Sequence, residues 1–398
     1  MPTELMARAV PVRPDAVAQP PRLGDQLVAC HGLKVLVHVC LQWLELPRMR
    51  VVLIGGSGFI GPHVARALLE SGHEVIVFHR GRSAVVAGAE EIIGDRRRLL
   101  DSAGALRATK PHVVVDLILS SAAQARDLMS VFQGAAARVV ALSSCDVYRA
   151  CGVLHGSEPG PLVPVPLVET SPLRTVMQTY PREQLQSLQQ VFGWLDEEYD
   201  KIPVEREVLL DAHLPGTVLR LPMVYGPGDP LHRLSSLVVR MDARRPAILM
   251  EENHSAWRAP RGFVTNVAAA IALAATREDA AGGIYNVAEV ENASELDWAR
   301  EVAAVIGWRG EFILLPAHRT PAHLRMPGNF DQHWAVDSTR IRSELGYREP
   351  VARREAIRAA VEWERSARVA DDSASLEFAA EDTILAELGD GVRSVRTE

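Results

Sequence analysis

Three glycines spaced three residues apart, Gly55, Gly58 and Gly61, follow an apolar run and precede a helical pattern. Residues 51–54 are uniformly apolar, as in a strand buried on both faces, and residues 62–71 repeat apolar side chains at helical spacing. In such a unit the first glycine allows a tight turn, the second lets the backbone approach a pyrophosphate, and the third lets the helix pack closely on the strand. Free N–H groups at the start of the helix stabilise phosphate charge. The pattern therefore predicts a dinucleotide site.

Further motifs follow the glycines along the chain. Phe59 and Ile60 stand between the last two glycines, and Ser-Ser-Cys-Asp-Val-Tyr occupies 143–148. Other motifs lie at 94–95, 201–205, 219–229, 261–264, 285–287 and 345–350. The ordered set resembles the extended short-chain dehydrogenase/reductase family, which contains nucleotide-sugar epimerases, dehydratases and atypical relatives. The resemblance implies an α/β fold with a doubly wound parallel sheet of the Rossmann type, a smaller C-terminal substrate domain and NAD(P)-dependent chemistry.

Members of this family use a hydroxyl residue, a tyrosine and a lysine. Ser144 matches the hydroxyl residue, which orients the substrate oxygen; the alternative is a serine that caps the end of a strand. Lys201, with Glu205 four residues later, matches the lysine, which holds the nicotinamide ribose and lowers the pKa of the tyrosine. The resemblance thus implies a catalytic set of Ser144, Tyr199 and Lys201.

The position of the tyrosine departs from the family pattern. The family spacing Tyr-x-x-x-Lys falls on Glu197, whereas Tyr199 is only two residues before Lys201. Residues two apart on a regular helix point about 200° apart. Pro203 disturbs a helix here, so Tyr199 and Lys201 could still converge. Three interpretations remain: Tyr199 is a displaced catalytic tyrosine, which we favour, Glu197 replaces it as the acid/base, or the redox chemistry is lost.

Two other residues are acid/base candidates. Asp146 lies near Ser144, at a place where the resemblance implies a carboxylate of sugar dehydratases, but Cys145 occupies the neighbouring acid position. Tyr180 offers a phenol from a later loop.

The end of the second predicted strand, at His79, bears on the choice of cofactor. An acid there hydrogen-bonds the ribose of NAD in dinucleotide folds, but this chain has Arg80 and Arg82 instead. Because guanidinium groups pair with a 2′-phosphate, the sequence favours NADP(H) over NAD(H), with solvated surface arginines as the alternative. The resemblance further implies that Asp95 accepts a hydrogen bond from the adenine amine and that Leu117 lies under the adenosine.

The substrate side is less specific. The resemblance implies that arginines of the small domain meet the pyrophosphate of a nucleotide sugar, and Arg233, Arg258 and Arg261 are candidates. We predict an NAD(P)-dependent epimerase/dehydratase or reductase that acts on a hydroxylated or keto small molecule, either a nucleotide sugar or a secondary metabolite. A non-catalytic NAD(P)-binding sensor is the alternative, which the displaced tyrosine favours.

Charge and composition exclude some partners. The 398 residues are 47% hydrophobic and 23% charged, as in soluble proteins. Of the net charge of −7, residues 371–398 carry −6, with eight acidic residues against two arginines. The nearly neutral remainder disfavours nucleic acid as the main partner. We expect a small-molecule substrate, and a homodimer is a possible assembly.

The cysteines and the long apolar stretch point to a cytoplasmic protein. The four cysteines show neither zinc-like spacing nor the density of a disulfide framework, so we predict free thiols and no metal site; they are Cys30, Cys40, Cys145 and Cys151. Residues 27–46 are apolar but are interrupted by Lys34 and Glu45, which predicts an amphipathic helix rather than a membrane span.

The elements that must position these residues alternate between strand and helix. We predict strands at 51–54, 74–78, 90–93, 112–118, 137–142 and 217–221, and helices at 62–71, 96–107, 122–132, 183–198 and 203–212. The predicted organisation is an N-terminal extension (1–48, partly disordered and dispensable for the fold), a Rossmann domain (49–221), a partly interleaved substrate domain (222–365) and an acidic tail (366–398). Within the tail, residues 374–389 predict an isolated acidic helix.

Overall fold

The computed structural model describes residues 48–177, 180–367, 373–388 and 394–396. The predictions made for residues 1–47 lie outside this part of the chain, including the disorder, the amphipathic helix and the thiols of Cys30 and Cys40. Cys145 and Cys151 are buried free thiols, as predicted. None of the helices in the described residues is long and apolar enough to cross a membrane.

A parallel seven-stranded sheet forms the centre of the structure, in the order β10-β6-β5-β4-β1-β2-β3. Its strands are β1 (Arg50–Ile54), β2 (Glu74–His79), β3 (Glu90–Ile93), β4 (Val113–Asp116), β5 (Arg138–Ser144), β6 (Gly216–Leu221) and β10 (Ile284–Asn286). The chain winds outward from β1 in both directions, which confirms the predicted doubly wound α/β fold. In such sheets the crevice for a ligand opens beyond the carboxyl ends of the strands where the winding direction changes, here β1 and β4.

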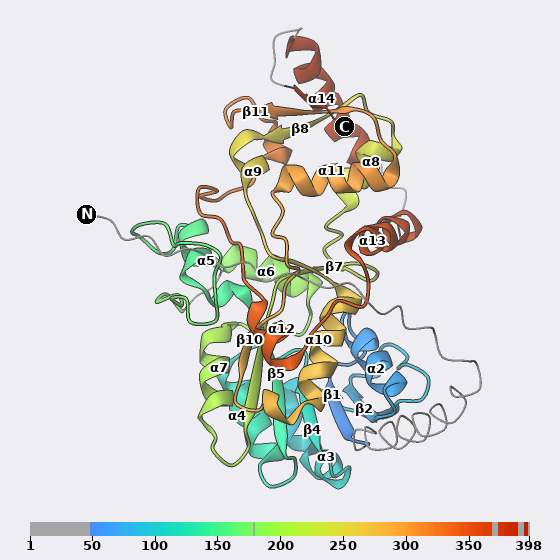
Figure 1. The fold of residues 1–398 in the computed structure, drawn as a ribbon, viewed down its shortest axis with the longest axis vertical. Helices are drawn as coiled ribbons and strands as arrows, with labels where there is room; N and C mark the ends of the chain where they lie inside the picture. Colours follow the sequence, from blue (N-terminus) through green and yellow to red (C-terminus); the bar gives the residue numbers. More distant parts are fainter. Residues whose placement is uncertain (1–47, 178–179, 368–372, 389–393, 397–398) are drawn as a thin grey trace, which may run out of the picture. The chain divides into compact units, whose positions relative to one another are not determined.

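Helices cover both faces of this sheet (Figure 1). One face packs against α2 (Gly61–Glu70) and the alanine-rich α10 (Val264–Thr276), and the other against α4 (Ala122–Phe132) and α7 (Lys201–Leu210). The central strands are buried by both layers, which explains why β1 after Arg50 and β4 before Asp116 are uniformly apolar.

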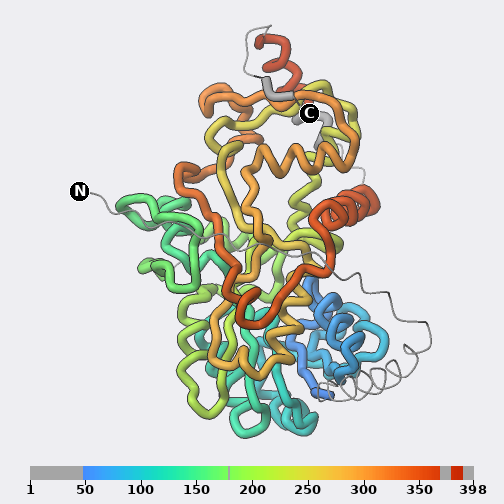
Figure 2. Tube along the Cα trace, in the orientation of Figure 1, coloured from blue at the N-terminus to red at the C-terminus, as the bar shows by residue number. Residues whose placement is uncertain are grey.

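The smaller subdomain is built mainly from the second half of the chain (Figure 2). The chain enters the subdomain after β7 (Met223–Tyr225) and leaves it at β9 (Arg261–Phe263), and these two strands form a parallel pair. Its three-stranded sheet has the order β12-β11-β8, and its other elements are helical. They are β8 (Ala247–Glu251), β11 (Glu311–Leu315), β12 (Ser394–Arg396), α8 (Ser235–Asp242), α9 (Glu252–Ala256), α11 (Glu295–Ile306), η4 (Ala322–Leu324) and α14 (Ser373–Leu388).

The chain returns from the subdomain to the main sheet. The remaining helices are η1 (Arg96–Ser102), α3 (Ala103–Ala108), η2 (Cys145–Val147), α5 (Arg149–Leu154), α6 (Arg182–Val191), η3 (Glu278–Ala280), α12 (Thr339–Leu345) and α13 (Arg353–Ala367). After β9, α10 and β10 belong to the layers of the main sheet, and α11 then belongs to the subdomain again. The chain therefore alternates between the two parts of the fold.

Two predictions about helices were wrong in ways that matter for the site. The helix predicted at 183–198 ends at Val191, and the helix predicted at 203–212 already begins at Lys201. Asp200 caps this second helix, because its carboxylate accepts a hydrogen bond from the N–H of Ile202 (2.9 Å). Pro203 lies in the first turn, where a missing N–H removes no helical hydrogen bond. Residues 192–200 are therefore a non-helical segment.

The C-terminal acidic helix is not isolated, which corrects the prediction for 374–389. Glu381 on α14 is fully buried and forms an ion pair with Arg240 of α8. Asp382 pairs with Arg245, and β12 extends the sheet by antiparallel pairing with β11. Two acidic residues of this helix, Glu381 and Asp382, thus compensate basic residues of the subdomain.

Candidate active site

The glycine turn between β1 and α2 has the backbone that a dinucleotide requires. Gly55 has a φ of +81°, and a Cβ there would lie within 3.0 Å of Ile118. A Cβ on Gly61 would lie 2.3 Å from the backbone of Gly56, so α2 packs directly on the turn. A Cβ on Gly58 would meet only a carbonyl oxygen, at 3.6 Å, which leaves its backbone open to a ligand. The three glycines thus permit the tight turn, the close packing of α2 and the approach of a ligand to the backbone, which are the three requirements of a dinucleotide site.

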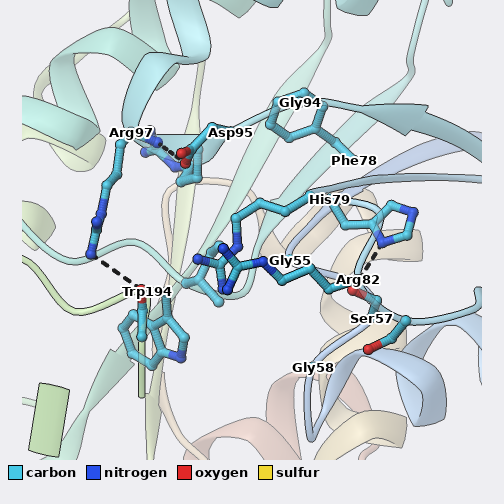
Figure 3. Close-up of a pocket in the computed structure, with 15 residues that line it drawn as sticks. Gly55, Ser57, Gly58, Phe78, His79, Arg82, Gly94, Asp95, Arg97 and Trp194 are labelled. Carbon is cyan, nitrogen blue, oxygen red and sulfur yellow. Dashed lines mark hydrogen bonds between the residues drawn. The ribbon is translucent and has the colours of Figure 1, made fainter. Parts of the chain in front are cut away.

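A cavity of about 280 Å³, here called the glycine-turn pocket, opens beside this turn. Figure 3 shows Trp194 and Arg97 on the opposite side of it from His79 and Ser57. His79 is buried, with Nδ1 3.1 Å from the Ser57 hydroxyl and Nε2 3.0 Å from Glu91. Its imidazole therefore fixes the wall of the pocket.

Basic side chains surround the same pocket. Arg80 and Arg82 line it and are exposed to solvent. Asp95 also lines it, and its carboxylate accepts a hydrogen bond from the N–H of Arg97 (3.0 Å). The Arg97 guanidinium donates to the carbonyl of Gly193 (3.1 Å), so it joins η1 to the non-helical segment 192–200. Neither Arg97 nor Gly193 was among the predicted site residues.

A buried ion pair lies behind this wall. Asp116, at the end of β4, accepts hydrogen bonds from Arg96 Nε (2.7 Å) and from the N–H of Ile118 (3.1 Å). Arg96 Nη1 is buried and has no hydrogen-bond partner among the described residues, although Arg96 lines the glycine-turn pocket. A buried donor without a partner costs free energy unless a ligand or water accepts from it. This donor, the open Gly58 backbone and the arginines together fit a dinucleotide.

A second cavity of about 230 Å³, here called the tyrosine pocket, adjoins the carboxyl ends of β4, β5 and β6. It brings together Ser144, Asp146, Tyr180, Tyr199 and Lys201. Both phenols donate to the same oxygen of Asp146, Oδ2, from Tyr180 at 3.2 Å and from Tyr199 at 3.1 Å. The two rings are stacked, with centroids 6.1 Å apart. The other oxygen of Asp146, Oδ1, is buried and has no partner in the described part of the chain.

Burial and the neighbouring carboxylate set the protonation of the phenols. Burial, followed by the charge of Asp146, raises the pKa of Tyr199 and that of Tyr180 well above the ordinary value of a phenol. Both side chains are therefore neutral hydrogen-bond donors at neutral pH. The resemblance implied the opposite shift for Tyr199, because it assigned Lys201 the role of lowering the pKa of the tyrosine.

Lys201 lies in the same pocket but binds the main chain. Its Nζ donates to the carbonyl of Leu142 (3.0 Å) and to that of Leu119, and it lies 5.5 Å from the ring centroid of Tyr199. The ring of Trp194 is at a similar distance, 5.6 Å. Burial lowers the pKa of Lys201 to about 8. The ammonium group thus holds the ends of β4 and β5 together beneath the pocket.

The other predicted residues divide between the two pockets. Ser144 lines the tyrosine pocket, and its hydroxyl also caps η2 by accepting from the N–H of Asp146 (3.2 Å), so the capping alternative is observed as well. Glu197 is exposed and lines neither pocket, which removes the support for it as a substitute acid/base. Leu117, predicted beneath the adenosine, lies in the tyrosine pocket with Phe59 and Ile60.

The predicted arginines of the small domain are all bonded to protein groups or lie outside the cavities. Arg233 lines the tyrosine pocket and pairs with Asp229 (2.6 Å). Arg261 is buried and pairs with Glu295, and Arg258 is exposed. No group of three His, Cys, Asp or Glu residues suited to a metal ion occurs within the described residues.

The family to which this chain belongs follows from a comparison with models of protein families. The model described as the NAD dependent epimerase/dehydratase family matches residues 51–288. The chain belongs to this family. Membership of the NAD dependent epimerase/dehydratase family confirms the resemblance found in the sequence.

Individual relatives extend the comparison. A 2-alkyl-3-oxoalkanoate reductase from Stenotrophomonas maltophilia is 31% identical over 191 residues, or 46% of this chain and 52% of that protein. The chain therefore spans about half the length of this curated relative. Among solved structures, MoeE5 in complex with UDP-glucuronic acid and NAD has a TM-score of 0.58 at 21% identity, covering 80% of this chain and 100% of that chain. WbmG from Bordetella bronchiseptica, in complex with NAD and UDP, has a TM-score of 0.57 at 19% identity, covering 80% and 96%. At these identities the two structures are evidence of the shared fold.

Proposed function

We propose that this family member catalyses hydride transfer between NADP(H) and a keto or hydroxylated small molecule. The observation that carries the proposal is the convergence of Tyr180 and Tyr199 on one buried oxygen of Asp146. A proton donor, a proton acceptor and space for a substrate thus adjoin the glycine turn. The relative from Stenotrophomonas maltophilia, whose name is that of a reductase, supports the direction of carbonyl reduction.

The residues of the pocket move the proton as a relay. Bound NADP(H) supplies the hydride to the substrate carbon, or accepts it in the reverse direction. In oxidation, the substrate hydroxyl gives its proton to the phenol oxygen of Tyr199 while the phenol gives its own proton to Asp146 Oδ2; reduction reverses both transfers. The phenol remains neutral throughout, which matters because burial opposes a phenolate. The carboxylate of Asp146 is the final acceptor.

Two further residues position the reacting groups. Ser144, at the end of β5, offers a hydroxyl to the substrate oxygen from the floor of the tyrosine pocket. Lys201 fixes the strand ends through the carbonyls of Leu119 and Leu142 and carries positive charge beneath the pocket. Its charge favours an oxygen that becomes anionic during hydride transfer.

Turnover of the reduced cofactor tests the function directly. The purified full-length chain, mixed with NADPH and a panel of ketones and nucleotide sugars, should consume NADPH, as followed by its absorbance. If the cofactor binds but none of the substrates is converted in either direction, the alternative of a non-catalytic NAD(P)-binding sensor is favoured.

The preference for NADP(H) is a separate prediction. Arg80 and Arg82 line the glycine-turn pocket, where no acid occupies the end of β2. A charge-assisted contact with a 2′-phosphate contributes about 1.5–3 kcal/mol, so the dissociation constant of NADPH should be at least roughly tenfold below that of NADH. Arg80→Asp should reverse the preference in a fluorescence titration. Arg206→Asp, an exposed arginine on α7, is the matched control and should leave it unchanged. Equal affinities of the unaltered protein for both cofactors would contradict the prediction.

A further inference from the structure

A third cavity, of about 390 Å³ and here called the distal pocket, lies in the smaller subdomain. It is enclosed by side chains of α8, β8, α11 and η4 and takes no part in the proton relay. Arg233 lines both the distal pocket and the tyrosine pocket. Met223 of β7 faces the distal pocket, whereas its neighbour Val224 faces the tyrosine pocket. A substrate held beside Tyr199 therefore has the distal pocket directly beyond β7.

Each arginine in the wall of the distal pocket has its own carboxylate. Arg240 donates to Glu381 from Nε (3.0 Å) and Nη2 (2.5 Å), and it also donates to the Ser236 hydroxyl (2.7 Å). Arg240 and Glu381 are both almost fully buried.

The other two arginines are compensated in the same manner. Arg261 pairs with Glu295, and its guanidinium lies 4.8 Å from the ring centroid of Trp298. Arg233 pairs with Asp229 and donates to the carbonyl of Val224 (2.8 Å). The three positive charges are thus matched by three carboxylates within the protein itself.

The remaining polar groups of the wall include one more carboxylate and two histidines. Glu251 lines the pocket, is 8% exposed, and its carboxylate has no ion pair or hydrogen bond among the described residues. His254 also lines it, and burial lowers the pKa of its imidazole. His323 lies 3.2 Å from Glu381. A diphosphate would therefore bring its negative charges to a wall that is already balanced and that carries an additional carboxylate.

The rest of the lining is apolar and adaptable. Isoleucine, leucine, methionine and tryptophan side chains make up most of it, among them Leu237, Met250, Trp257 and Trp298. Unbranched methionines adjust to chains of different shape, and apolar surface favours ligands by removal from water. These features suit an alkyl or aryl group.

We propose that the distal pocket binds the apolar, uncharged tail of the substrate and excludes nucleoside diphosphates. Any polar group on that tail is a hydrogen-bond donor that reaches the Glu251 carboxylate. The inference rests on the proposed function for the reacting end of the substrate, and it selects a hydrophobic carbonyl compound over the nucleotide sugar that the resemblance also allowed.

Calorimetric binding to the full-length protein tests the tail independently of turnover. The probes are 2-butanone, 2-undecanone and UDP, each titrated in the presence of saturating NADP⁺. Each methylene buried should tighten binding about fourfold, so 2-undecanone should bind at least about a hundredfold more tightly than 2-butanone. UDP should bind more weakly than 2-undecanone. Equal affinity for the two ketones, or tighter binding of UDP, overturns the inference.

A variant that fills the cavity locates the tail. Leu237→Trp places a larger ring in the distal pocket from a half-buried position on α8, and it should weaken 2-undecanone binding at least tenfold without affecting 2-butanone. Leu210→Trp, at an exposed leucine of α7, is the matched control and should change neither. Undiminished binding of 2-undecanone to a folded Leu237→Trp protein also overturns the inference. If the ketones bind as expected and NADPH reduces none of them, it is the proposed function that fails.

Discussion

Asp146→Asn is expected to lower kcat by about 10²–10⁴-fold, the usual contribution of a general acid/base, while the dissociation constant of NADPH changes little. An amide keeps the shape of the carboxylate and can still accept a hydrogen bond from a phenol, but it cannot take up the proton. Asp146 also lies apart from the glycine-turn pocket, whose walls hold the cofactor in the proposal. The variant should therefore bind NADPH and fail at proton transfer.

The two phenols provide the comparison. Because Tyr180 and Tyr199 donate to the same oxygen of Asp146, either could serve the relay in the absence of the other. Tyr199→Phe and Tyr180→Phe should each lower kcat less than Asp146→Asn does, and the double variant should approach it. Asp331→Asn, at an exposed aspartate, should be fully active. Full activity of Asp146→Asn with an unchanged melting temperature would rule out the relay.

Arg220→Met should lower the free energy of unfolding by about 3–5 kcal/mol, because it leaves a buried charge without its partner. Arg220, on β6, is 2% exposed and donates to both oxygens of Glu205, at 2.7 and 3.0 Å. It also donates to the phenol oxygen of Tyr148 (3.0 Å). Ser143 donates to the same carboxylate at 2.5 Å, so the network lies directly beneath the catalytic end of β5.

Denaturant unfolding followed by circular dichroism measures this loss. The double variant Arg220→Met/Glu205→Gln should recover part of it, because the uncompensated carboxylate is gone. Arg300→Met, which removes an exposed partner of Asp297 on α11, is the matched control and should change stability far less. A small loss in Arg220→Met, comparable to that of Arg300→Met, would show that the buried pair contributes little.

Local patterns predicted the parts of the fold that depend on neighbours in the sequence. The glycine spacing identified the turn between β1 and α2, because the need for each glycine arises from the backbone of the turn itself. The alternation of strands and helices located six of the seven strands of the main sheet to within a few residues, but β10 was not predicted as a strand. Pro203 correctly suggested irregular backbone near Tyr199, but its effect begins earlier than expected, since the cap at Asp200 starts α7 at Lys201.

Contacts between distant segments could not be inferred in this way. The bond from Arg97 to Gly193 joins residues almost a hundred positions apart, and it depends on where α6 ends. Likewise, the arginine motif beginning at Arg261 predicted a cation for a phosphate, but the sequence gives no sign that Glu295 neutralises it. A residue type indicates what a side chain can bind, whereas its partner is decided by tertiary packing.

The place of α14 in the order of synthesis has a consequence for the distal pocket. Every residue that lines the distal pocket precedes α14 in the sequence, so on the ribosome the guanidinium of Arg240 is made long before the carboxylate of Glu381. A chain that has not yet reached this helix presents an uncompensated positive charge inside an apolar cavity. The charge of Arg240 is therefore compensated only once α14 has packed against α8.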